Sequence, residues 1–217
     1  MTIDYANFTR ASNLIHIIQG VSLLLVGAAQ AYAADNKESK FPLSAALLLA
    51  LSGAAMFVVM LALPGGWSFS QLAEALDVRR GFYIFIAFSC VFSAAGLSLF
   101  TKELMGRAGT SWQAMGLLLL AFAGILYFLL AWRVNEEAWR QVLVFHAAVG
   151  ATLLVAVAVK ALDTFRPRRA LHLAWAVLLL VTGLQLVTYS ESDGAFAPTV
   201  VSLQSSPELP AAEVSPK

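Results

Sequence analysis

The sequence predicts an all-α, polytopic integral membrane protein, a six-transmembrane-helix bundle. Two observations predict this fold: an apolar composition and six long windows without a charged side chain. Of the 217 residues, 59% are hydrophobic and 12% are charged, whereas a soluble domain carries about 25% charged residues. The excess apolar surface is therefore expected to face lipid, and the lipid bilayer is the first expected partner.

The six windows contain no Asp, Glu, Lys or Arg. A helix needs about 20 apolar residues to cross the hydrocarbon core, and a charge at mid-membrane costs a few kcal/mol or more. From these windows we predict spans at about 13–34, 42–63, 82–100, 112–132, 141–162 and 170–189, of which the fifth extends past its window to include Lys160. Backbone inside lipid must satisfy its own hydrogen bonds, so each span is expected to be helical.

Residues 1–190 are thus predicted to form one transmembrane domain, and residues 191–217, with four prolines, a disordered polar tail. The connectors are short, which favours antiparallel neighbours. The longest, 64–81, contains a candidate short helix at the membrane interface. A cleaved secretory signal ending at Ala31-Tyr32-Ala33 is the alternative for the first span, but His16 and Gln19 interrupt its apolar run and favour a true span.

Orientation follows from the basic residues at the two membrane surfaces. We call the surface that holds the N-terminus the near side and the opposite surface the far side. The near side holds five basic residues: Arg10, Arg79, Arg80, Arg133 and Arg140. The far side holds seven: Lys37, Lys40, Lys102, Arg107, Arg166, Arg168 and Arg169. The excess predicts a cytoplasmic far side and non-cytoplasmic termini.

All three histidines, His16, His146 and His172, lie in the apolar windows, and each has a small residue four positions later. Positions i and i+4 share one face of a helix, so each small residue lets a backbone or a flat cofactor approach beside the histidine. Odd-numbered spans run from the near to the far side. Therefore His16 and His146 are expected at similar depth, while His172 lies near the far surface.

This geometry leaves two hypotheses for the histidines. One is a b-type haem held between the first and fifth spans by His16 and His146, because neutral imidazole ligates haem iron. The other is hydrogen bonding between helices, which is common in membrane bundles. No two histidines lie within one helix at ligand spacing, so no metal site is predicted.

A polar face on the first span gives further candidates. Gln19 and Gln30 fall within about 60° of His16 on a helical wheel, and amides facing lipid would lose their hydrogen bonds. In the third span Ser89 and Ser93 form a similar stripe. We predict that these five residues line a ligand site or a polar path, with helix–helix adhesion as the alternative.

The opening of the chain resembles heliorhodopsin, a branch of the microbial rhodopsins, in Asn7-Phe8-x-Arg10, His16-Ile17-Ile18-Gln19 and Ala46–Ser52. The resemblance implies inward-facing His16 and Gln19 and a bacterial or archaeal cell membrane. That family has seven helices and a retinal-binding lysine in the last. Here there are six spans and the last has no lysine, so covalent retinal is not expected.

For function the sequence favours a non-enzymatic membrane protein, acting as a binding, channel-like or accessory subunit. Other membrane subunits or a second copy of the chain are its expected protein partners. No nucleophile–base pair or glycine-rich phosphate loop is present, and a net charge of +1 indicates no nucleic-acid partner. The alternative function is electron transfer through haem b.

Overall fold

The computed structural model describes residues 4–192, 195 and 196, except the side chain of Arg107. Within these residues the chain is helical and has no β-strand. The helices are α1 (Tyr5–Ala33), α2 (Phe41–Ala62), α3 (Phe69–Val78), α4 (Tyr83–Met105), α5 (Thr110–Leu129), α6 (Glu136–Phe165) and α7 (Arg169–Thr188). Short 3-10 turns precede α4 and follow both α4 and α5.

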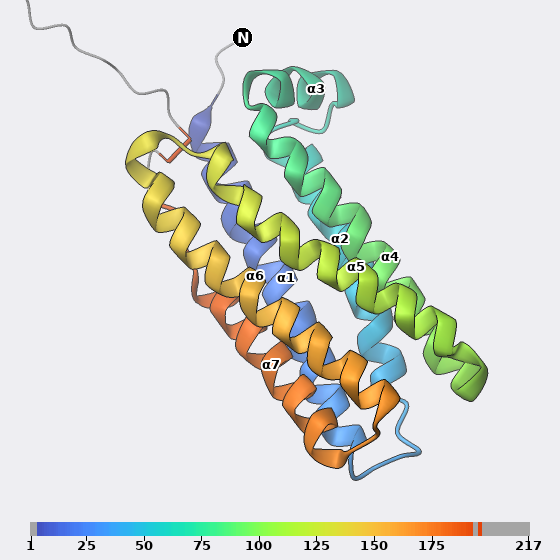
Figure 1. The fold of residues 1–217 in the computed structure, drawn as a ribbon. Helices are drawn as coiled ribbons and strands as arrows, with labels where there is room; N and C mark the ends of the chain where they lie inside the picture. The colour runs from blue at the N-terminus through green and yellow to red at the C-terminus, as the bar shows by residue number, and fades with distance from the viewer. Residues whose placement is uncertain (1–3, 193–194, 197–217) are drawn as a thin grey trace, which may run out of the picture.

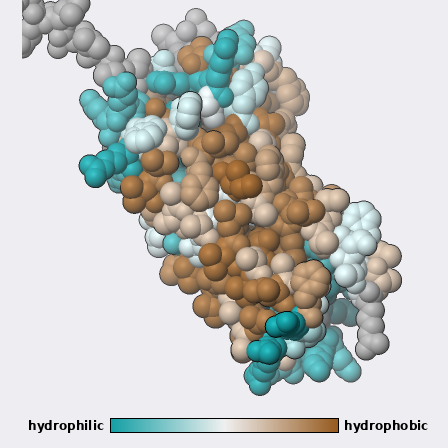
Figure 2. Space-filling view, viewed as in Figure 1, coloured by the Kyte–Doolittle hydropathy of each residue, from teal (hydrophilic) through white to brown (hydrophobic). Residues whose placement is uncertain are grey.

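Six of the helices in the described part of the chain, all except α3, are long and apolar enough to cross a membrane. Figure 1 shows them running along one long axis, with α3 at the end that also holds the N-terminus. In Figure 2 a hydrophobic band covers the middle of the visible face, and hydrophilic residues gather at its two ends. The predicted all-α bundle is confirmed.

Helix ends differ from the predicted spans by a few residues. The largest differences are at α1, which begins at Tyr5, and at α6, which begins at Glu136. At both starts a side chain caps the helix: Asp4 accepts from the Ala6 amide and Asn135 from the Ala138 amide. Charges mark where lipid ends, but a capped helix continues into the polar zone beyond it.

The spanning helices close into a ring. Each packs against its neighbours along the chain, and α1 also packs against α7. Small residues permit the closest approaches: a Cβ placed on Gly20 of α1 would lie 2.6 Å from the Gly183 oxygen of α7. A Cβ on Gly150 of α6 would lie 2.6 Å from the Gly124 oxygen of α5. In lipid the hydrophobic effect contributes little to the association of helices, so such close packing stabilises the bundle.

The segment after α7 does not begin as the predicted disordered tail. Glu191, Ala195 and Phe196 are all buried at the near end, with 4%, 1% and 0% of their surfaces exposed. The Asn135 amide donates to the Ala195 carbonyl, and Arg79 donates to the Phe196 carbonyl. The tail boundary at 191 was therefore wrong for these residues, because near-side polar groups bind this backbone. The rest of the predicted tail lies outside the described residues.

Candidate functional site

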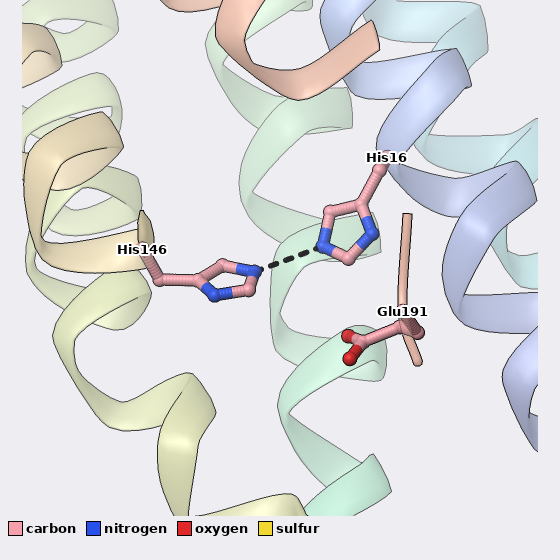
Figure 3. A group of neighbouring side chains, drawn as sticks. All are labelled: His16, His146 and Glu191. Atoms are coloured by element: carbon pink, nitrogen blue, oxygen red, sulfur yellow. Dashed lines mark hydrogen bonds between the residues drawn. The ribbon is translucent and has the colours of Figure 1, made fainter. Parts of the chain in front are cut away.

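His16 and His146 meet in the interior of the ring near the near side. Their Nε2 atoms lie 3.1 Å apart, and neither residue has any exposed surface. Figure 3 shows the two rings reaching toward each other from α1 and α6, which are not neighbours in the ring. The two histidines therefore lie at similar depth, as the sequence predicts, and they also contact each other directly.

A backbone carbonyl fixes the proton on His146. Its Nδ1 lies 2.7 Å from the Val142 oxygen, and a carbonyl can only accept a hydrogen bond. Nδ1 therefore carries the proton, and the neutral ring keeps its lone pair on Nε2, which faces His16. Metal-binding histidines commonly donate their second N–H to a carbonyl in this way, because the bond fixes both tautomer and ring orientation.

Glu191 brings a carboxylate to the same place from the segment after α7. It pairs with Arg133, and its Oε1 also accepts from the Ser12 hydroxyl at 3.1 Å. Its Oε2 accepts from the Tyr189 hydroxyl at 3.0 Å, and its amide donates to Asn13 at 2.8 Å. These contacts draw the start of the C-terminal segment into the bundle.

The two imidazoles and the carboxylate can supply three metal ligands. One ligand atom from each of His16, His146 and Glu191 can be chosen so that all lie within 4.8 Å of one another. Around tetrahedral zinc, with Zn–N of about 2.0–2.1 Å, neighbouring nitrogens lie about 3.3 Å apart, close to the spacing of the two Nε2 atoms. A carboxylate offers about four lone-pair positions, and Arg133, Ser12 and Tyr189 use three of those on Glu191.

Aromatic rings pack against both histidines. The Tyr189 ring centre lies 5.0 Å from that of His16 and 4.8 Å from that of His146. Tyr127 stacks on His146 at 6.3 Å. Burial, and then the charge of Glu191, raise the pKa of Tyr189 well above its ordinary value. Its hydroxyl therefore stays protonated and continues to donate to the carboxylate.

Three polar atoms at this site lack a partner among the described residues. They are Nδ1 of His16, Nε2 of Gln19 and Nε of Arg133. The Gln19 oxygen accepts from the Tyr127 hydroxyl at 3.1 Å. Gln19 therefore lies beside the histidine pair, in contact with the tyrosine that stacks on His146. Buried polar atoms without partners are costly and rare in folded proteins, so they mark the place where a further group would bind.

The other predicted lining residues lie elsewhere. Gln30 is at the far end, and the buried positions of α1 between it and Gln19 are small or apolar except Ser22, whose hydroxyl donates to the Gln19 carbonyl of its own helix. In this structure no continuous polar path follows that face. Ser89 and Ser93 of α4 also do not line the site.

These two serines instead bind α2. The Ser89 hydroxyl donates to the Gly53 carbonyl and the Ser93 hydroxyl donates to the Ala50 carbonyl at 3.1 Å. These contacts correspond to helix–helix adhesion, the alternative expected for these serines, and a role in lining a ligand site stays a prediction. A helical wheel gives the direction of a side chain but does not identify the helix that it meets.

A haem does not fit between His16 and His146 as they stand. Axial ligands bind from opposite faces of the macrocycle, whereas these Nε2 atoms touch each other at 3.1 Å. The small residues expected to admit a flat cofactor instead admit helices: Gly20 faces the Gly183 backbone, and Gly150 faces the Gly124 backbone. The room inferred from the sequence is filled by protein.

The expectation of no metal site was derived from spacing within single helices. The structure assembles its candidate set from three separate segments instead: α1, α6 and the residues after α7. Arg133, counted from the sequence among the near-side basic residues, is 3% exposed and pairs with Glu191. One sequence signal could have indicated this: Glu191 is the first acidic residue after the last span, on the side of His16 and His146.

His172 lies at the far end, as predicted, and makes different contacts. Its Nε2–H donates to the Gln30 carbonyl at 2.8 Å, and its Nδ1 accepts from Lys160 at 3.3 Å. Lys160 also pairs with Asp163 at 2.9 Å. Both ring nitrogens of His172 are therefore used by the protein.

Comparison with known proteins identifies no relative of this chain. No protein family, curated protein or solved structure matches the chain, and the heliorhodopsin resemblance stays a prediction.

Proposed function

We propose that this protein is a non-enzymatic integral membrane protein that binds a transition-metal ion inside its helical bundle. His16, His146 and Glu191 are the proposed ligands. The observation that carries the proposal is the pair of facing Nε2 atoms, 3.1 Å apart, with the lone pair of His146 oriented by the Val142 carbonyl. Imidazole nitrogen suits zinc, copper, iron and nickel among the common metals.

Burial supports binding in preference to catalysis. Catalytic metal sites keep an open position for water or substrate, whereas His16 and His146 have no exposed surface and Glu191 is 4% exposed. The Arg133 charge beside the site disfavours a further cation, and the Glu191 carboxylate offsets that charge. Loss of Glu191 should therefore weaken metal binding through both a lost ligand and an uncompensated Arg133.

The charge distribution supports an orientation for this site. With seven basic residues at the far side against five at the near side, the near side faces away from the cytoplasm. In a bacterial or archaeal cell membrane, the proposed site would then lie closer to the external face. An ion would reach it past the segment that follows α7.

A metal titration tests the proposal. The full chain is purified in detergent with a tag that contains no histidine, stripped with a chelator and titrated with Zn²⁺ or Co²⁺. We expect one ion per chain and a visible Co²⁺ spectrum of tetrahedral type. His16→Ala and His146→Ala should each weaken binding by more than about 100-fold, because loss of a ligand exceeds the 10–100-fold effect of an outer-shell partner.

His172→Ala is the matched control, since it removes a histidine from the far end and should leave the affinity unchanged. Absence of stoichiometric binding, or equal loss in His172→Ala, would contradict the proposal. A Soret band in the purified protein would instead support the haem alternative.

A further inference from the structure

A second polar site lies at the far end of the bundle and is independent of the metal proposal. A small cavity there has a volume of about 20 Å³ and is lined by residues from α1, α4, α5, α6 and α7. Five of the six spanning helices therefore meet around it. Its polar lining residues are Gln30, Lys102, Glu103, Gln113, Lys160 and Trp175. A volume of about 10–15 Å³ is enough for one water, so the cavity accommodates a single small particle.

The indole of Trp175 provides a donor with no acceptor. Trp175 lines the cavity and is 2% exposed, and its Nε1 has no hydrogen-bond partner among the described residues. An indole N–H can only donate. A buried donor without an acceptor is costly, so the cavity is expected to hold a group that accepts a hydrogen bond.

Two ammonium groups add positive charge to the same lining. Lys160 uses two of its three donors, on Asp163 at 2.9 Å and on His172 at 3.3 Å. Lys102 uses one, on Glu103 at 2.8 Å. Since an ammonium has three donors, both lysines have donors to spare within these contacts. Glu103 is the one carboxylate in the lining, and Lys102 already pairs with it.

We propose that this far-end cavity binds one small monovalent anion, of halide size. Within the lining two ammonium groups stand against one carboxylate, that of Glu103, and the indole N–H has no acceptor among the described residues, so an anion is favoured over a cation. The cavity volume of about 20 Å³ has room for one monatomic ion or one water. Lys102 is paired with Glu103, and Lys160 is paired with Asp163. The anion would accept one hydrogen bond from the Trp175 indole and one from the spare donor of the Lys160 ammonium group.

Tryptophan fluorescence tests this proposal on the full chain in detergent. The four other tryptophans are all exposed: Trp67, Trp112, Trp132 and Trp139, at 70%, 44%, 81% and 43%. Replacing them with Phe leaves Trp175 as the sole emitter. We expect iodide to quench its emission saturably, chloride to compete, and Lys160→Met to weaken the apparent affinity at least tenfold. Lys40→Met, which alters an exposed far-side lysine outside the lining, is the control and should change nothing.

A second readout covers the case in which that variant does not fold. The melting temperature of the otherwise unaltered protein should be higher in chloride than in gluconate at equal ionic strength. Trp175→Phe, which keeps the ring and removes the N–H, should abolish the difference. Linear quenching without saturation, an unchanged affinity in Lys160→Met, or no chloride-specific stabilisation would overturn the proposal and leave the cavity with water only.

Discussion

The near and far ends of the bundle each combine a histidine with an ion pair, but the two ends differ in how deeply these groups are buried. Each end has histidine beside an acid–base pair, but the Arg133–Glu191 side chains are 1% and 0% exposed, whereas the Lys160–Asp163 side chains are 15% and 11% exposed. At the far end both nitrogens of His172 bind protein groups. At the near end the Nε2 atoms of His16 and His146 hydrogen-bond each other instead, so that no other protein group occupies them.

This difference shows that the environment, rather than the residue type, decides what a membrane histidine can do. One metal ion can replace the hydrogen bond between two imidazoles by taking the Nε2 lone pair of each, whereas the His172 nitrogens bind a carbonyl and an ammonium group. Arginine also suits the dry end, because its planar guanidinium forms several directed hydrogen bonds to a carboxylate. Lysine suits the wetter end, where its ammonium can reach water.

The largest expected effect is loss of the buried acid. Glu191→Gln leaves the Arg133 charge without its partner in a dry site, and breaking a buried ion pair from one side costs about 3–5 kcal/mol. Asp163→Asn at the far end should cost about 1 kcal/mol or less, because that pair is partly solvated. Unfolding of both variants in detergent checks the contrast, and equal losses would remove the distinction between the two ends.

Helix packing beside the site should give the next largest effect. Gly20→Ala places a methyl group 2.6 Å from the Gly183 oxygen, which forces α1 and α7 apart and should cost about 1–3 kcal/mol. Gly116→Ala is the control, since its added methyl group would meet first the Leu99 side chain, at 2.9 Å, and that chain can move. A shift in thermal unfolding for Gly20→Ala no larger than for Gly116→Ala would contradict the packing argument.

Alkaline pH should separate Tyr189 from exposed tyrosines. Because the pKa of Tyr189 is raised in the folded protein, its contribution to stability is complete below the unfolded value of about 10 and declines as the pH rises above it. Tyr189→Phe should therefore lose less stability than the wild type between pH 9 and 11, by at most about 1 kcal/mol per unit above 10. Tyr32→Phe, at a position 54% exposed, should follow the wild type.

The smallest effect is expected at the serines that connect α4 to α2. Ser93→Ala removes one hydrogen bond between helices and should cost about 0.6 kcal/mol. Zinc affinity should not change, because Ser93 binds the Ala50 carbonyl and not the histidine pair. A loss of metal binding in this variant would return Ser93 to the ligand site.

The fold could be predicted from charge spacing alone, because lipid excludes charges over a length that fixes each span. The equal depth of His16 and His146 followed from the placement of the spans, since alternate spans run in the same direction. The sequence shows Glu191 as the first acid after the last span, but its contact with the site could not be predicted, because no helical period extends past the end of α7. Its position depends on Arg133, Ser12 and Tyr189 meeting from separate segments.

The central claim is that His16 and His146 share one metal ion, and zinc X-ray absorption of the loaded full chain tests it most directly. We expect two imidazole nitrogens and at least one carboxylate oxygen at about 2.0–2.2 Å from the zinc, with the same spectrum in His172→Ala. A zinc environment without an imidazole pair, or one that is unchanged in His146→Ala, would contradict it.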